Sequence, residues 1–94
     1  MLYIVSYDLR TPGQDYPKLI TTLKGMGGVK VLLSAWLVPS TKDATPLRQE
    51  IDQNGGLDSN DRLMVVELRN HAAWRNILAP DATVQQLFRD HART

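Results

Sequence analysis

The sequence predicts a single α+β domain in which an antiparallel β-sheet carries helices. Three observations support this fold class. Runs of β-branched and aromatic residues alternate with segments of helical apolar spacing, turn-forming residues separate them, and 94 residues leave room for one core. Hydrophobic residues make up 43% of the chain and charged residues 22%, which is typical of a globular protein. We therefore expect one domain over residues 1–94, with a core at about 1–68 and a helical extension at about 70–91.

The first third of the chain predicts a strand, a helix and a long extended segment. Residues 2–7 are apolar, aromatic or β-branched apart from one serine, which indicates a central strand buried on most of both faces. A turn at residues 11–14 and a cap at Asp15 precede a helix that ends in a glycine cluster. Residues 29–38 are interpreted as extended, either as one bent strand or as two strands in tight succession. The apolar face of the helix consists of Tyr16, Leu19, Ile20, Leu23 and Met26.

The next segment predicts a second helix and another strand. Thr41 or Asp43 is expected to cap the helix, and the Asn-Gly-Gly at residues 54–56 is expected to end it. Residues 62–68 (RLMVVEL) then predict a strand.

The C-terminal quarter is helical in composition. We expect a helix over residues 71–78, a break at Pro80, and a restart at Asp81 or Thr83. The tail over residues 90–94 is expected to fray.

The order of strand, helix, extended pair, helix and strand is that of a ferredoxin-like βαββαβ fold. Two helices on one face of such a sheet leave the other face in need of cover. Because the first and last strands are almost entirely apolar, self-association through the sheet is the simplest cover. Cover by the C-terminal helices is the alternative to self-association, since these helices could pack on the same face.

Charge and composition exclude several classes of function. The chain has 11 Lys and Arg against 10 Asp and Glu, so a net charge of +1 gives no general attraction to nucleic acid. A sequence-independent nucleic-acid binder is therefore disfavoured. The absence of cysteine excludes disulfides, zinc–thiolate sites and thiol nucleophiles, and it fits a cytoplasmic protein. No apolar run approaches the roughly 20 residues that cross a bilayer, so no membrane association is expected.

Three segments resemble the CRISPR-associated protein two family. The opening LYIVSYDLR resembles that family's first strand, which ends in Tyr-Asp, and VKVLLSAWLV resembles its second strand, with Ser34-Ala35-Trp36 at the centre. The closing RLMVVEL stands where the family has its fourth strand, so the resemblance covers about residues 1–68. Within this group the chain looks closest to SinR-like homologues found outside CRISPR loci, and it is distantly similar to the VapD ribonuclease toxins.

This resemblance implies a homodimer whose two sheets face each other. It also implies a Mg²⁺ or Mn²⁺ site where Asp8 meets its counterpart in the second copy. Some family members cut RNA or DNA with such a metal, whereas others only bridge partners. The sequence departs from the family in its helical C-terminus, in its lack of an evident basic surface, and in Leu32, where some members have Gln. These departures count against a role in spacer integration.

The candidate catalytic residues are Asp8, Arg10 and Ser34, with Asp8 as the metal ligand. Magnesium prefers carboxylate oxygens, Arg10 could reach a phosphate, and Ser34 could add a hydroxyl at the rim of the site. Each residue also has a structural interpretation. Asp8 could hydrogen-bond the turn that follows its strand, Arg10 could be a solvated loop charge, and Ser34 could pair with backbone in the sheet.

Two functional hypotheses follow and remain open. The first is a metal-dependent nuclease that works as a dimer on RNA or DNA. The second is a non-catalytic dimeric adaptor that binds a protein partner.

Asp58 and Asp61 are interpreted as a polar turn, because the spacing lacks the other ligands of a calcium loop. Trp36 and Trp74 are interpreted as core or interface residues, because no basic residues are interleaved with them for base stacking.

Overall fold

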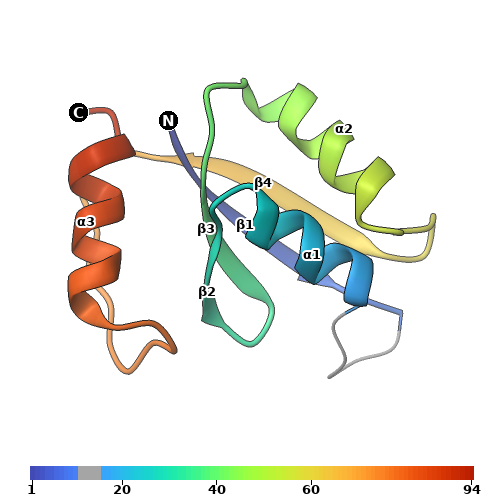
Figure 1. The fold of residues 1–94 in the computed structure, drawn as a ribbon, viewed down its shortest axis with the longest axis horizontal. Helices are drawn as coiled ribbons and strands as arrows, with labels where there is room; N and C mark the ends of the chain where they lie inside the picture. The colour runs from blue at the N-terminus through green and yellow to red at the C-terminus, as the bar shows by residue number, and fades with distance from the viewer. Residues whose placement is uncertain (11–15) are drawn as a thin grey trace.

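Strands and helices alternate in a computed structural model that describes residues 1–10 and 16–94. The predicted turn at residues 11–14 and the predicted cap at Asp15 lie outside the described residues. Figure 1 shows a sheet with helices on both sides. Its elements are β1 (Leu2–Asp8), α1 (Pro17–Gly25), β2 (Val29–Leu32), β3 (Ala35–Pro39), α2 (Ala44–Asn54), β4 (Arg62–Leu68) and α3 (Asp81–His91).

The four strands form an antiparallel sheet in the order β2-β3-β1-β4. Strand β1 is therefore flanked on both sides, as its apolar sequence predicts, and Val5 pairs with Trp36 of β3 and Val65 of β4. The α+β class is confirmed. The register of β1 with β4 also sets Asp8, the last residue of β1, opposite Arg62, the first residue of β4.

The extended segment at 29–38 consists of two strands in tight succession. Leu33 and Ser34 form the turn between β2 and β3. The pairing shifts between Lys30 and Leu32, which marks a β-bulge or similar irregularity in β2. Val31 is buried, whereas Leu32, beside it in the chain, is half exposed.

Helices α1 and α2 cover the first face of the sheet. In each helix the buried residues are four positions apart, Leu19 and Leu23 in α1 and Leu47 and Ile51 in α2, so they share one side of the helix. Asp43 occupies the cap position of α2, although its side chain makes no capping hydrogen bond. The buried core on this face consists of Tyr3, Val5, Tyr7, Leu19, Leu23, Trp36, Val38, Leu47 and Ile51.

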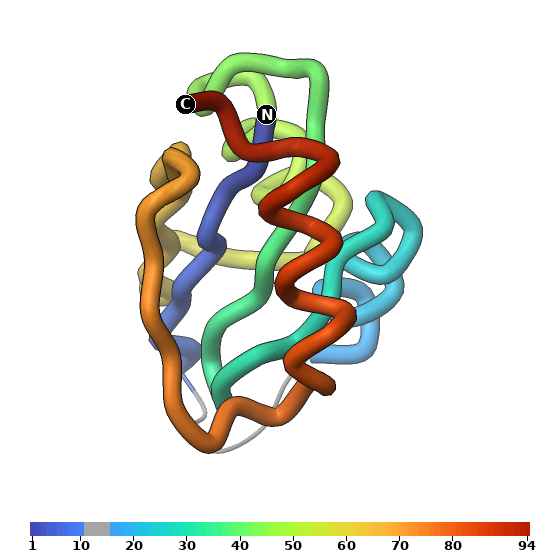
Figure 2. Tube along the Cα trace, turned by 90° about the vertical axis from the view of Figure 1, so that its left-hand side faces the viewer, coloured from blue at the N-terminus to red at the C-terminus, as the bar shows by residue number. Residues whose placement is uncertain are grey.

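The second face is covered in part by α3 and by the segment that leads to it. In Figure 2 the chain leaves β4, runs down at the left of the view, and returns upward as α3 in front of the sheet. The buried residues here come from the sheet and from α3 together. They are Leu2, Val31, Ala35, Leu37, Ala79, Val84 and Phe88. The chain thus covers part of its own second face, as the rival interpretation of the C-terminus expected.

The helix predicted over residues 71–78 is wrong, because this segment is irregular and helix begins only at Asp81. The segment has to cross from the β4 side to β2, where the Leu78 amide donates to the Val31 carbonyl at 2.9 Å. Extended chain covers about 3.3 Å per residue against 1.5 Å for helix, so an irregular segment covers more distance with the same number of residues. Asn76 adopts a left-handed conformation, with φ of 54°, where the chain bends.

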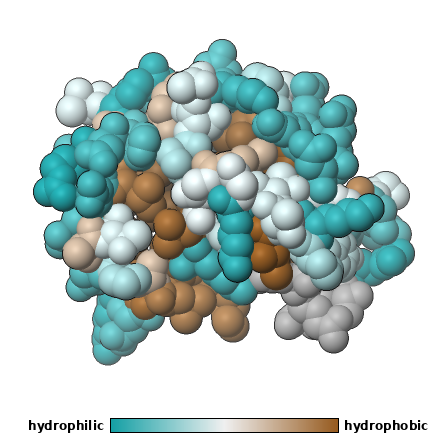
Figure 3. All heavy atoms as spheres, in the orientation of Figure 1, coloured by the Kyte–Doolittle hydropathy of each residue, from teal (hydrophilic) through white to brown (hydrophobic). Residues whose placement is uncertain are grey.

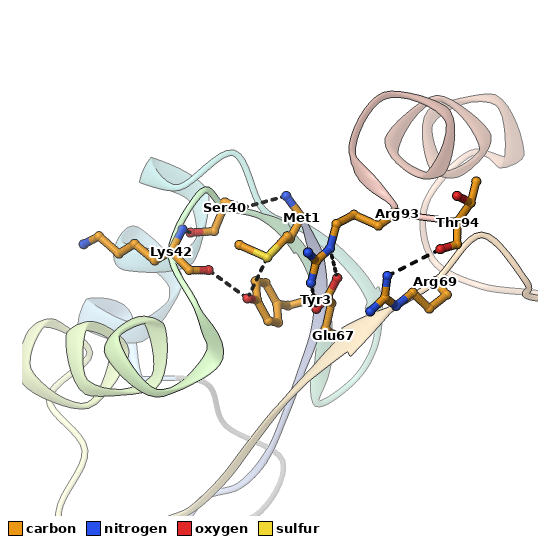
Figure 4. A network of polar contacts seen from close by, with 8 residues as sticks. All are labelled: Met1, Tyr3, Ser40, Lys42, Glu67, Arg69, Arg93 and Thr94. Atoms are coloured by element: carbon orange, nitrogen blue, oxygen red, sulfur yellow. Dashed lines mark hydrogen bonds and ion pairs between the residues drawn. The ribbon is translucent and has the colours of Figure 1, made fainter.

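The C-terminal tail is anchored rather than frayed. Arg93 donates two hydrogen bonds to the Glu67 carboxylate, at 2.7 and 2.6 Å, and its carbonyl accepts the Asn70 amide at 3.1 Å. Figure 4 shows this contact next to the start of the chain, where the Met1 ammonium donates to the Ser40 carbonyl at 2.8 Å. Both ends of the chain are therefore fixed at the same end of the sheet. None of the described helices has the length and apolarity that crossing a membrane requires.

Candidate functional site

Asp8 lies at the end of β1 with its carboxylate open to solvent. The side chain is 77% exposed, and Oδ2 lies 4.0 Å from Nη1 of Arg62 on β4. Among the described residues no backbone amide donates to this carboxylate. The expected hydrogen bond to the following turn is thus not made by any residue in the described part of the chain. The carboxylate is accessible and only loosely held.

Asp8 belongs to the half of the second face that α3 leaves open. Side chains alternate along a strand, so Asp8 shares this face with Ser6, and the register adds Arg62, Met64 and Val66 of β4. Met64 is 63% exposed and Val66 is 43% exposed. A shallow hollow of about 250 Å³ lies between the ends of β1 and β4, next to Asp8 and Met64. The face therefore has a covered half, around Leu2, Val31 and Leu37, and an open half, around Asp8, Met64 and Val66.

Arg10 is bound to the turn that contains Asp58 and Asp61. Its backbone amide donates to Oδ1 of Asp61 at 2.8 Å, and its guanidinium pairs with Asp58 at 3.3 Å. The guanidinium next to Asp8 is instead that of Arg62. Sequence reasoning missed Arg62 as a site residue. The signal that would have found it is the antiparallel pairing of β1 with β4, which sets the last residue of one strand against the first residue of the other.

The turn around Asp58 and Asp61 is a hydrogen-bonded structure. The Asp61 carboxylate accepts hydrogen bonds from the amides of Arg10 and Asp58 and from the Tyr16 hydroxyl, at 2.8, 3.0 and 2.9 Å. The amide hydrogen bonds stabilise the charged form and hold the pKa of Asp61 below its ordinary value. Desolvation of the Tyr16 hydroxyl, and next its hydrogen bond to Asp61, raise the pKa of Tyr16. Asp61 thus fixes the loop that carries Arg10, which agrees with its interpretation as part of a polar turn.

Ser34 lies in the β2–β3 turn at the same end of the sheet as Asp8. Its carbonyl accepts a hydrogen bond from the Tyr7 amide at 3.0 Å, so the Ser34 backbone adjoins the residue before Asp8. The side chain is exposed. This hydrogen bond is made by the main-chain carbonyl, whereas the structural interpretation of Ser34 concerned its hydroxyl. The structure therefore brings Asp8, Arg62 and the Ser34 turn to one end of the sheet, and it ties Arg10 to Asp58.

One chain supplies a limited set of metal ligands. In the described residues, no three His, Asp or Glu side chains lie close enough together to hold a metal ion. Magnesium in proteins is often held by only one or two carboxylates, with water and substrate phosphate filling the other positions. Asp8 from a single chain provides one such carboxylate, and two copies of the chain would provide two. The residues fit a divalent ion if two copies meet at Asp8.

Comparison with known proteins gives no match: the sequence matches no protein-family model, no curated protein and no solved structure.

Proposed function

We propose that this chain is a homodimeric, metal-dependent nuclease of ferredoxin-like fold, in which Asp8 from each copy holds Mg²⁺ or Mn²⁺. The observation that carries the proposal is the accessible Asp8 carboxylate on the open half of the second sheet face. The strand order β2-β3-β1-β4, with α1 and α2 on the first face, supports the ferredoxin-like assignment.

The open half also has the composition of a surface that contacts another copy. Met64 and Val66 expose apolar side chains on a flat sheet, and a second copy related by a two-fold axis would bury both. Asp8 and Arg62 lie beside them on the same surface. Arg62 offsets the repulsion that two Asp8 carboxylates would otherwise create at such an interface.

The residues of the chain would have distinct roles in phosphodiester cleavage. A bound divalent ion supplies charge neutralisation at the phosphate and a more acidic water. Asp8 would ligate the ion, and Arg62 would pair with a phosphate oxygen of the substrate. The Ser34 hydroxyl would contact substrate at the rim. Arg10 would act indirectly, because its guanidinium already pairs with Asp58.

A nuclease assay with Asp8→Ala tests the catalytic proposal. Purified wild-type protein is incubated with Mn²⁺ and labelled single-stranded RNA, single-stranded DNA or duplex DNA, with EDTA as the blank. We expect cleavage by the wild type and a loss of at least about 100-fold in Asp8→Ala, because metal charge stabilisation contributes several kcal/mol. Asp43→Ala is the matched control, since Asp43 is an exposed carboxylate without a capping hydrogen bond. Equal cleavage by Asp8→Ala and wild type would refute the assignment of the site.

The oligomeric state tests the dimer independently of catalysis. We expect the wild type to have the mass of a dimer by light scattering after size exclusion. Met64→Lys would then be a monomer, because it sets a charge in the apolar contact. Thr21→Lys, an exposed change on α1, is the control and should remain a dimer. If the wild type stays monomeric at all concentrations, the proposal that two Asp8 carboxylates hold one metal ion is refuted.

A non-catalytic dimeric adaptor is the second candidate. It is favoured by the arrangement at Asp8, where each chain offers one carboxylate and Arg62 already lies 4.0 Å from it. In this case the wild type would form the Met64-dependent dimer but cleave no substrate with either metal. Asp8→Ala would then leave the dimer and its binding of a protein partner intact.

A further inference from the structure

A second hollow lies between α3 and the segment that precedes it. It has a volume of about 320 Å³ and is separate from Asp8. Its walls come from the C-terminal extension alone, which the proposed nuclease site does not use. The lining residues are Asn70, Ala72, Trp74, Gln85, Phe88 and Arg89.

An aromatic pair forms one wall of this hollow. The ring of Trp74 stacks on that of Phe88, with the centroids 5.8 Å apart and the planes inclined by 16°. The Trp74 indole N–H donates to the Asp81 carboxylate at 3.0 Å, which fixes the orientation of the ring. Phe88 is almost completely buried, whereas Trp74 is only partly buried. The hollow thus presents an aromatic surface that is already held in place.

The remaining walls carry hydrogen-bonding groups and a positive charge. Asn70 and Gln85 have side-chain amides, each of which can donate and accept a hydrogen bond. Arg89 lies at the same hollow, and no ion pair with Arg89 occurs among residues 1–10 and 16–94. Arg89 is 15 positions from Trp74 in the sequence, and α3 places it at the same hollow.

Positive charge is concentrated in the C-terminal region that forms this hollow. Residues 69–94 have four arginines against two aspartates, a net charge of +2. Residues 1–68 have seven Lys or Arg residues against eight Asp or Glu residues, a net charge of −1. The near-neutral total therefore conceals a basic C-terminal extension. A local excess of arginine is what attraction to a phosphate backbone requires.

We propose that this hollow binds an unpaired base of a single-stranded nucleic acid, which stacks on Trp74. Asn70 and Gln85 pair with the edge of the base, and Arg89 contacts the adjoining phosphate. Aromatic surfaces with nearby arginines bind single strands in this way, since every base has a face that can stack. Duplex would bind poorly, because its bases are already stacked and paired. This site does not depend on Asp8 or on a dimer.

Fluorescence anisotropy with labelled 12-nucleotide RNA and DNA, single-stranded and duplex, tests the proposal. We expect single strands to bind in preference to duplex, and affinity to fall with added salt. Trp74→Leu should weaken binding about 5- to 150-fold, which is the range for loss of one base stack. Trp74→Phe should retain most of the affinity. Comparison of the RNA and DNA arms shows which sugar is preferred.

Surface variants keep the test independent of folding. Arg89→Ala and Gln85→Ala change exposed side chains of α3 and should weaken binding while the circular dichroism spectrum stays unchanged. Lys24→Ala, on α1, removes the same charge as Arg89→Ala at an exposed position and should bind like the wild type. Binding is measured in EDTA, so that no metal at Asp8 contributes, and failure of the nuclease proposal leaves this one standing. Unchanged affinity in both Arg89→Ala and Trp74→Leu, or equal binding of duplex, would overturn it.

Discussion

Phe88→Ala should destabilise the protein strongly, because the ring of Phe88 joins α3 to the sheet. Phe88 is 8% exposed and packs in the cluster that includes Leu2 and Leu37, and its ring also stacks on Trp74. Removal of a buried phenyl ring costs about 3–5 kcal/mol of unfolding free energy, out of a total of about 5–15 kcal/mol for a domain. At about 4–8 °C per kcal/mol for a domain of this size, the melting temperature should fall by about 12–40 °C.

Urea unfolding followed by circular dichroism measures this loss. Leu78→Ala is the matched control, because Leu78 is 58% exposed and its substitution should cost no more than about 0.5 kcal/mol. A loss in Phe88→Ala below about 1 kcal/mol, or one equal to that of Leu78→Ala, would refute the packing of α3 as described. Amide hydrogen exchange distinguishes detachment of α3 alone from unfolding of the whole domain. If α3 detaches alone, protection is lost in α3 and retained in β1. The loss of unfolding free energy then cannot exceed the free energy with which α3 docks on the sheet.

Two further predictions concern a glycine and an ion pair. Gly28→Ala should cost about 1–3 kcal/mol, because a Cβ there would lie 2.6 Å from the Leu23 carbonyl oxygen, and backbone cannot easily move. Gly25→Ala has no atom within 4 Å of the new Cβ and should be neutral or stabilising by up to about 1 kcal/mol, so thermal melting of the two variants should diverge. Hydrogen bonds from Arg93 lower the pKa of Glu67 below its ordinary 4.5, so this contact stabilises the fold at neutral pH and is lost as pH falls below 4.5. Wild type should therefore melt above Glu67→Gln at pH 7 and match it near pH 3; an equal difference at both pH values would contradict this reasoning.

The elements that depend on local spacing could be predicted from the sequence. The nearly continuous apolar run of β1 and the four-residue spacing of Leu47 and Ile51 are properties of the chain itself, and the structure has both elements where they were expected. The two glycines that follow α2 are equally local signals. Strand boundaries within residues 29–38 were harder, because the shift between Lys30 and Leu32 depends on pairing with β3.

Features that depend on long-range packing could not be predicted in the same way. Residues 71–78 have a helical composition, yet their conformation follows from the distance to β2, where Leu78 binds the Val31 carbonyl. The anchoring of Arg93 depends on Glu67, which lies 26 positions earlier. The site shows the same contrast. Asp8 was found from its place at a strand end, whereas Arg62 became a neighbour only through the pairing of β1 with β4.

The position of α3 limits how two copies of this chain could meet through the sheet. Val84 and Phe88 of α3 are buried on the covered half of the second face together with Leu2 of β1, so that half is already occupied by the chain itself. Figure 3 shows another apolar surface, between polar regions, beside β2 in the lower part of the view. A contact that used the whole sheet would require α3 to leave, at the cost of exposing those side chains. A dimer that uses this face and keeps α3 in place must meet through the open half, where Met64, Val66 and Asp8 lie. The proposed contact therefore places Asp8 in the interface, and leaves the hollow at Trp74 outside it.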